Sequence, residues 1–430
     1  MSQTALGPIK LSPGVRPVHA LTFLYTAFIG ITLNTYVNFI QPYVLTEQLA
    51  IPESSQGAVT GNLVFYSELM LLVACAVIGV LADRVGRRLV FAAGFIILAC
   101  GFALYGYVQT EAELLALRLF FAWGVATINV LVTTLQADYP QEESRGKLAG
   151  FTGFAIGLGA LFLVFVLARL PEWYSPGRDA IEAGRLALWT VSGFAVISAV
   201  IAVMGLLGGK PHGIAEPTQD WRESMAAALL CARRNRKVGL AYACAFVARG
   251  DLIVIGVFFS LWMTQTGIAA SMDTAKAVSM AGMYFGIIQA VALVSAPFLG
   301  VAIDRLNRVT AMALALLLAA VGYGSLALIS DPLGTAMIPA AIFLGLGQMA
   351  VMLASQTLIG QEAPQEQRGA VMGMYSLCGA LGIMFITKVG GEVFDLWKPG
   401  PFAIVAVANL LLFLVALPLR HDEQAVPHSA

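Results

Sequence analysis

Charge is scarce in this chain. Only 12% of its 430 residues are Asp, Glu, Lys or Arg, whereas an average soluble domain has about 25%. Hydrophobic residues make up 59% and the mean hydropathy is +0.81. Because 25 basic residues balance 25 acidic ones, the chain has no basic surplus with which to bind nucleic acid. So much apolar surface excludes an ordinary soluble fold and predicts a membrane protein.

Residues for metal, redox or covalent chemistry are also few. The five cysteines are scattered without a C-x-x-C pair, and there are only four histidines. No nucleotide-binding loop, metal constellation or nucleophile–base pattern is present. We therefore expect no enzymatic activity, no cofactor and no resident metal. The first 17 residues lack the apolar stretch of a secretory signal, so we expect the first apolar segment to remain as a spanning helix.

Long apolar runs fill most of the chain. A helix needs about 20 apolar residues to cross a bilayer. The sequence predicts an all-α membrane protein with twelve such segments: 18–45, 56–82, 88–108, 112–137, 147–168, 186–208, 238–266, 277–302, 309–329, 336–361, 369–390 and 401–419.

The basic residues between these segments predict an orientation. With both termini in the cytoplasm, the inner loops and tails hold 17 Lys and Arg, and the outer loops hold 6. Cytoplasmic loops carry the excess of Lys and Arg, so we expect this orientation in a cell inner (plasma) membrane. We also expect a monomer.

The predicted domains follow from the same division. They are a cytoplasmic tail (1–17), a six-helix bundle (18–208), a cytoplasmic linker (209–237), a second six-helix bundle (238–419) and a second tail (420–430). The linker contains DWRESMAAALLCARRNRK, which predicts an amphipathic helix with a basic end on the inner membrane surface. It is expected to tether the two bundles, with a regulatory or docking role as the alternative.

Two charged loops repeat at half the chain length. GVLADRVGRR (Gly79–Arg88) and GVAIDRLNR (Gly300–Arg308) place their aspartates 221 residues apart. A second pair of loops, QADYPQEESRG and QEAPQEQRG, follows the fourth and the tenth span. Internal repeats of this kind are typical of transporters built from two related halves. In these paired loops the whole chain resembles the major facilitator superfamily of secondary transporters.

The resemblance implies a latch in the first half. In that family the loop aspartate faces the start of a helix in the other half, and the arginines pair with acids on a neighbouring helix. By resemblance, Asp83 would meet the start of the eleventh span near Gly369. Arg87 would reach Asp138. An anion at a helix N-terminus is stabilised by about 0.3–1 kcal/mol, which supports the first contact. A purely topology-setting role for these charges is the alternative.

The second half would carry a matching latch. Asp304 would meet the start of the fifth span near Gly146, and Arg308 would reach Glu362. Asn307 stands where the first loop has Gly86, so the second latch is expected to be weaker. The complete set of expected latch residues is Gly79, Asp83, Arg84, Gly86, Arg87, Asp138, Arg145, Gly300, Asp304, Arg308, Glu362 and Arg368.

Charged residues inside the spans are functional candidates, because an unpaired charge in lipid costs several kcal/mol. Arg249 and Asp251 fall in the middle of the seventh span, where a cavity role competes with a structural ion pair. Glu68 and Arg118 lie at similar heights in the second and fourth spans. We hypothesise that they form or break an ion pair as a proton is carried, with Asp251 as a further proton site. A hydrogen-bonded structural role for Glu68 is the alternative.

A polar stripe marks the first span. Asn34, Asn38 and Gln41 at i, i+4 and i+7 share one helical face, and Pro42 is expected to kink the helix after it. A polar face on a spanning helix turns towards a cavity or a neighbour. The resemblance places the first and seventh helices around the substrate cavity, so its expected lining is Asn34, Asn38, Gln41, Arg249, Asp251 and Gln289, the repeat partner of Glu68.

The leading functional hypothesis is a secondary transporter that moves a small amphipathic organic solute by alternating access, with proton-coupled efflux favoured. Uptake of a small organic anion together with protons is one alternative. A membrane sensor or scaffold that no longer transports is another. The fifth span lacks the G-x-x-x-G-P-x-x-G-G string typical of the family's antiporters, which weakens an assignment as a proton-antiport drug exporter.

Overall fold

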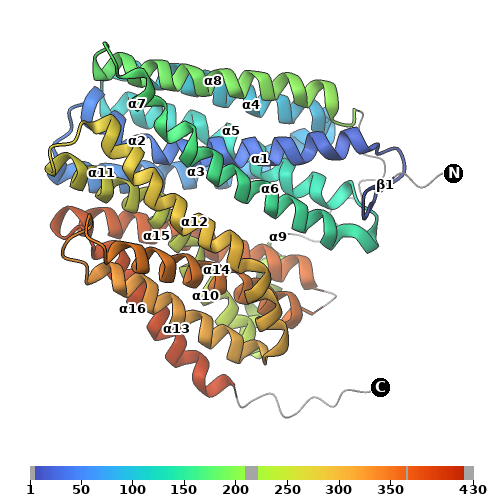
Figure 1. Cartoon of the computed structure of the whole chain (residues 1–430). Helices are drawn as coiled ribbons and strands as arrows, with labels where there is room; N and C mark the ends of the chain where they lie inside the picture. Colours follow the sequence, from blue (N-terminus) through green and yellow to red (C-terminus); the bar gives the residue numbers. More distant parts are fainter. Residues whose placement is uncertain (1–4, 209–220, 365–366, 421–430) are drawn as a thin grey trace, which may run out of the picture. The chain divides into compact units, whose positions relative to one another are not determined.

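The computed structural model describes residues 5–208, 221–364 and 367–420, and almost all of them are helical (Figure 1). The side chains of Trp221, Arg222, Ser224, Asp251 and Leu252 lie outside the described part. Within it, twelve helical stretches are long and apolar enough to cross a membrane. The shortest, Arg87–Tyr105, has 19 residues and is about 28 Å long, close to the thickness of a hydrocarbon core. The prediction of twelve spanning helices is confirmed.

The first half of the chain begins with a small hairpin and continues with helices. Its elements are β1 (Ala5–Leu6), β2 (Ile9–Lys10), α1 (Pro17–Phe39), α2 (Gln41–Tyr43), the π-helix η1 (Val44–Gln48), the 3-10 turn η2 (Glu53–Ser55), α3 (Gln56–Val85), α4 (Arg87–Tyr105), α5 (Glu111–Asp138), η3 (Glu142–Ser144), α6 (Arg145–Phe165), η4 (Leu167–Arg169), α7 (Leu170–Tyr174) and α8 (Ala180–Gly205).

All regular elements among the described residues of the second half are helices. Its elements are α9 (Trp221–Arg234), α10 (Arg236–Val254), the π-helix η5 (Ile255–Phe259), α11 (Ser260–Ala269), α12 (Thr274–Arg305), α13 (Arg308–Ala327), α14 (Met337–Glu362), α15 (Arg368–Leu396) and α16 (Gly400–Leu419). Helix α1 ends at Phe39 and the Pro42-containing α2 begins at Gln41, so the regular helix is interrupted at Ile40, within the polar stripe, and the predicted kink at Pro42 stays a prediction.

The chain divides into two compact units. Unit 1 consists of 1–59, 66–214 and 263–286, and unit 2 of 60–65, 215–262 and 287–430. A short piece of α3 therefore groups with the second half, and α11 with the start of α12 groups with the first. The predicted bundle boundaries at 18–208 and 238–419 stay a prediction.

Small residues bring the helices of unit 1 together. Helix α4 packs against both α5 and α8, and α1 packs against α6 and α8 (Figure 1). A Cβ atom at Gly94 of α4 would lie 2.6 Å from the Thr127 side chain of α5, and one at Gly124 would lie 2.8 Å from Leu98. These glycines permit the close crossing that helix association in a membrane favours.

Unit 2 uses the same device. Helix α13 packs against α14 and α16, and α10 packs against α15. A Cβ atom at Gly382 of α15 would collide with the backbone carbonyl of Phe246 in α10. Gly250 of α10 in turn lies against Ile386 of α15. The backbones of α10 and α15 therefore touch in the part of unit 2 that carries Arg249.

The N-terminal tail is folded. Strands β1 and β2 pair antiparallel, and Leu11 forms a β-bridge with Pro140 in the loop after α5. The backbone N–H of Lys10 donates to Ser144 Oγ at 3.0 Å, and the Lys10 ammonium lies 2.9 Å from Glu143. Ile9 and Leu11 are almost completely buried. Residues 5–12 thus form a strap across the loop that carries one of the repeated motifs.

The amphipathic helix predicted in the linker is present as α9, and it packs against α15 and α10. Residues 209–220 of the linker and 421–430 of the C-terminal tail lie outside the described residues.

Candidate functional site

The first repeated loop is a tight turn between α3 and α4. It turns at Gly86, whose φ of +108° and ψ of +138° favour glycine over residues that carry a side chain. Arg87 therefore begins α4 directly after Asp83 and Arg84 have ended α3. A single residue thus connects the two helices, and the charged residues on either side of it lie close together.

Arg87 pairs with Asp138, as expected. The Arg87 guanidinium contacts the carboxylate at the C-terminal end of α5, and its other nitrogen lies 3.9 Å from Asp83. Next to this pair, the Tyr139 hydroxyl accepts a hydrogen bond from the Leu207 N–H at 3.1 Å. Burial raises the pKa of Tyr139, so this phenol stays neutral at physiological pH.

The second loop differs from the first in its turn and its pairing. Asn307 caps α13, because its side-chain oxygen accepts hydrogen bonds from the N–H groups of Val309 and Thr310. The second loop therefore has a helix-capping asparagine at the position where the first loop has a glycine with positive φ. Arg308 donates to Asp304 at 3.0 Å and to Gln361 at 3.0 Å.

The expected pair between Arg308 and Glu362 was wrong in this conformation. Glu362 accepts a hydrogen bond from Asn235 at 2.7 Å, and the Lys237 ammonium lies 3.8 Å away. The physical reason is that the start of α10 brings an amide and a cation to Glu362, leaving Arg308 to the neighbouring Gln361. Neither side chain was a predicted latch residue.

The remaining expected latch residues lie in the last turns of spanning helices or at the first residue of the helix that follows a loop. Arg145 begins α6 and is exposed, and Arg368 begins α15 and donates to the Gly360 carbonyl at 3.3 Å. A Cβ atom at Gly79 or Gly300 would meet no atom within 4 Å. The expected partners of Asp83 and Asp304 belong to the other unit, so those contacts and the latch role of the whole set stay predictions.

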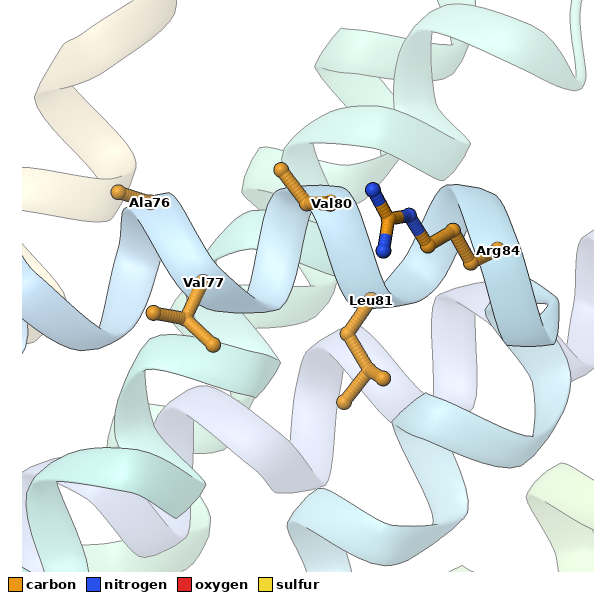
Figure 2. Close-up of a pocket in the computed structure, with 5 residues that line it drawn as sticks. All are labelled: Ala76, Val77, Val80, Leu81 and Arg84. Atoms are coloured by element: carbon orange, nitrogen blue, oxygen red, sulfur yellow. The ribbon is translucent and has the colours of Figure 1, made fainter.

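Arg84 lies at the end of an apolar groove along α3. Figure 2 shows Ala76, Val77, Val80 and Leu81 preceding it on the same helix, in a depression of about 440 Å³. A solute site needs polar groups that converge from several elements. This groove offers one arginine from one helix, so we do not take it as the substrate site.

Arg118 is the most deeply buried charge of unit 1. Only 4% of the residue is exposed. Its Nη2 donates to the Asn38 side-chain oxygen, and the Tyr105 hydroxyl lies beside the guanidinium. Within the described part of the chain, its Nε and Nη1 have no hydrogen-bond partner. The other members of the polar stripe lie nearby in sequence, Asn34 half-buried and Gln41 almost completely buried.

The proposed ion pair between Glu68 and Arg118 is not the contact that holds the arginine here. Arg118 is held by Asn38, while Glu68 of α3 is half-buried and close enough for its charge to act on the guanidinium. Both parallel N–H pairs with which a guanidinium holds a carboxylate include Nη2, and Nη2 of Arg118 is bonded to Asn38. Glu68 would therefore have to displace Asn38 to bind Arg118 in this way, and the exchange stays a prediction.

Arg249 is an exposed charge in the middle of a spanning helix. It lies 13 residues after the start of α10, about 20 Å along the axis. Its side chain crosses Gly379 of α15, where an added Cβ would collide with it. Next to it, Tyr375 shares a 2.8 Å hydrogen bond with Ser355 of α14. No carboxylate of the described side chains lies within ion-pair distance of Arg249.

Two other predicted cavity residues gave different outcomes. Asp251 belongs to α10, but its side chain lies outside the described residues, so its pairing and its proton role stay predictions. Gln289 of α12 is half-buried, and its side-chain oxygen has no hydrogen-bond partner in the described part. Its place in a substrate cavity stays a prediction.

Sequence reasoning missed a polar cluster in unit 2. Lys388 donates to Asn62 at 2.7 Å and lies 3.2 Å from Glu392. Lys388 was counted with the outer-loop basic residues although it lies inside the predicted eleventh span (369–390), and α15 continues beyond that span to Leu396. The signal was present in the i, i+4 spacing of Lys388 and Glu392, which is typical of a continuing helix.

Several basic and polar side chains are thus available for binding, whereas metal ligands do not gather. The described residues contain no group of three His, Cys, Asp or Glu side chains placed to hold a metal ion.

Comparison with known families gives a match over nearly the whole chain. The family model described as Major Facilitator Superfamily matches residues 22–387 and 242–429, which together cover nearly the whole chain. The fold is shared with solved transporters: the structure of a D-xylose-proton symporter aligns with a TM-score of 0.72 at 17% identity and covers 95% of this chain and 98% of that one.

Curated relatives are similar along most of their length. Magnetosome protein MamH of Paramagnetospirillum magneticum is 27% identical over 419 residues, which cover 94% of this chain and 93% of that protein. Multidrug resistance protein 2 of Bacillus subtilis is 24% identical over 416 residues, covering 94% of this chain and 96% of that protein.

Proposed function

Because this chain belongs to the Major Facilitator Superfamily, whose members are membrane transporters and not enzymes, we propose that it exports a small organic solute in exchange for protons. The solute is amphipathic and carries an anionic group such as a carboxylate. Transport proceeds by alternating access, in which two helix bundles move relative to a site near the middle of the membrane.

Arg249 carries the proposal. A charged side chain in the middle of a spanning helix costs several kcal/mol unless it is paired or hydrated. Arg249 is exposed and has no carboxylate partner among the described side chains. A guanidinium in this position is suited to bind a carboxylate or phosphate through two N–H groups.

Arg118 supplies the proposed link to protons. While Glu68 is protonated, Arg118 rests on Asn38. When Glu68 loses its proton, the carboxylate competes with Asn38 for the guanidinium. Proton release and the movement of α3 relative to α5 would thereby become coupled. Asp251 is a further proton-binding candidate.

Substrate class is tested by thermal-shift screening of compound classes on the purified protein. We expect stabilisation by amphipathic carboxylates, abolished by Arg249→Ala and partly retained by Arg249→Lys. If the hits are neutral or cationic and Arg249→Ala leaves their shifts unchanged, the anionic-solute proposal is wrong.

Direction and coupling are tested in proteoliposomes with the solute found in this way. An acidic lumen drives solute accumulation if the exchange is with protons, whereas an acidic exterior drives it if uptake is together with protons. Binding without any solute movement would favour the sensor alternative. Full proton-driven transport by Glu68→Gln would exclude the role given to Glu68 and Arg118.

The uptake alternative is favoured by one observation. The fifth span, now α6 (Arg145–Phe165), has no Gly-Pro pair, unlike the antiporters that the sequence resembles in its loops. The proteoliposome experiment decides between the two directions, because they require opposite proton gradients.

A further inference from the structure

Helix α9 has two different faces. Ala228 and Cys231 are buried against the helices of unit 2. On the outer surface Leu229 and Leu230 are 54% and 47% exposed. Arg233 and Arg234 follow these leucines at i+4, so each arginine lies one turn further along the same face of the helix as one leucine. Both arginines are also exposed. The free surface of α9 therefore passes from leucine to arginine within one turn.

The position of α9 puts this surface at the membrane boundary. The helix ends at Arg234, and α10, a spanning helix, begins at Arg236. Leucines exposed at this level can enter the acyl region while the arginines remain among the headgroups, which is how surface-bound amphipathic helices are seated.

The basic residues here are largely uncompensated. Among the described side chains, Arg233, Arg234 and Arg236 form no ion pair. The nearby acid Glu362 is engaged by Asn235 and Lys237 instead. A partner with negative charge is therefore the one that this surface complements.

A pocket lies next to the arginines. Its volume is about 270 Å³, and its lining includes Leu230, Arg234, Asn235, Pro364 and Gln367. It combines a guanidinium and two side-chain amides with an apolar edge. That combination matches a phosphate ester attached to a hydrocarbon chain.

We propose that α9, residues 233–236 and this pocket form a binding site for the phosphate headgroup of an anionic membrane lipid. The acyl chains lie along Leu229 and Leu230, and the phosphate is held by Arg233 and Arg234. An acidic protein segment would use the arginines but would leave both leucines unused. The bound lipid also contacts the chain next to Asn235, and so reaches the hydrogen bond between Asn235 and Glu362 at the end of α14.

The test is native mass spectrometry of the purified full-length chain, titrated with phosphatidylglycerol or with phosphatidylcholine of the same acyl chains. We expect tighter binding of phosphatidylglycerol, and a loss of affinity of roughly fivefold for each arginine removed in Arg233→Gln and Arg234→Gln. Arg305→Gln is the matched control, since Arg305 is an exposed arginine of the same unit, outside this pocket and without an ion pair in the described part.

Two further arms identify the source of the phosphate. Glycerol 3-phosphate, which has the charge but no acyl chains, is expected not to bind. The double variant Leu229→Ser, Leu230→Ser is expected to lower phosphatidylglycerol affinity while leaving the thermal unfolding temperature in detergent unchanged, because both leucines are exposed.

Four outcomes would overturn the proposal. Phosphatidylglycerol affinity could be unchanged in a variant that combines Arg233→Gln with Arg234→Gln, or Arg305→Gln could lose as much affinity as Arg233→Gln. Binding of glycerol 3-phosphate as tight as that of the lipid would assign the pocket to a soluble phosphate. Acidic peptide binding that depends on the arginines but not on the leucines would assign it to a protein partner.

Discussion

At the scale of single residues, the buried guanidinium of Arg118 has more hydrogen-bond donors than acceptors around it in the described part of unit 1. The guanidinium has one partner, Asn38, and two nitrogens without any in the described part of the chain. A buried donor without an acceptor lowers stability. A protein retains such a group where it has a use for the donor, which is why Arg118 rather than a surface charge enters the proposed mechanism.

Asn38→Ala is expected to lower the free energy of unfolding by about 1.5–3 kcal/mol, because it removes a hydrogen bond to a buried charge. Arg118→Met is expected to cost less stability, because it removes the charge together with its need for partners. It should nevertheless abolish proton-driven transport. Thermal unfolding in detergent and flux in proteoliposomes separate the two effects. Equal destabilisation by both substitutions would show that the charge is a structural element only.

The backbone conformation at Gly86 favours glycine over any residue that carries a side chain. Gly86→Ala places a side chain at a φ of +108° and is expected to cost roughly 1–3 kcal/mol of stability. Gly193→Ala in α8 is the control, since a Cβ there meets open space and is expected to stabilise the helix by about 0.4–1 kcal/mol. Chemical unfolding measures both. A neutral Gly86→Ala would mean that the turn relaxes without cost.

At the scale of elements, the strap formed by residues 5–12 was not predicted from the sequence. It adds a β-bridge at Pro140 and a hydrogen bond to Ser144. The loop so fixed lies between Asp138, the partner of Arg87, and the start of α6. The strap therefore holds in place the loop on which the first latch depends.

Ser144→Ala is expected to loosen this loop. Loss of one partly buried hydrogen bond costs about 0.5–1.5 kcal/mol, which corresponds to roughly 2- to 12-fold faster amide hydrogen exchange in residues 139–147. Hydrogen exchange followed by mass spectrometry reports the change. Ser192→Ala in α8 is the control, because it also removes one hydrogen bond between a serine side chain and the backbone, here the one that Ser192 donates to the Ala99 carbonyl, and it should leave residues 139–147 unaffected. Unchanged exchange in Ser144→Ala would mean that the strap does not constrain the loop.

At the scale of the whole molecule, the repeat explains why each half has a similar charged loop, while the details differ. The first turn is formed by a glycine with positive φ, Gly86, and the second by a capping asparagine, Asn307. Arg87 pairs with Asp138, whereas Arg308 donates to Gln361. The two halves are therefore not interchangeable. An asymmetric response to protons is compatible with this difference.

The orientation of the molecule is a further prediction. Because the basic residues gather at the loops that carry the repeated motifs, both termini are expected in the cytoplasm. A fluorescent protein fused after Ala430 should then fluoresce, and alkaline phosphatase fused there should be inactive. Fusions truncated after Gly177, between α7 and α8, should behave in the opposite way. The reverse pattern would overturn the orientation.

The sequence by itself determined the number of spanning helices, the internal repeat and the family. These follow from composition and spacing, since a hydrocarbon solvent permits few structures and each span must be long and apolar. The contact of Arg87 with Asp138 was expected only by resemblance to the family, and the structure contains that ion pair.

Only the tertiary structure decided which polar groups meet. Asn38 at Arg118, Asn235 at Glu362, and Lys388 at Asn62 join residues 80, 127 and 326 positions apart. Such pairs depend on how helices are rotated and crossed, and glycines such as Gly382 set those crossings through close backbone contact. Spacing along one helix carries no information about the rotation of its neighbour, and for that reason the partners had to be seen in space.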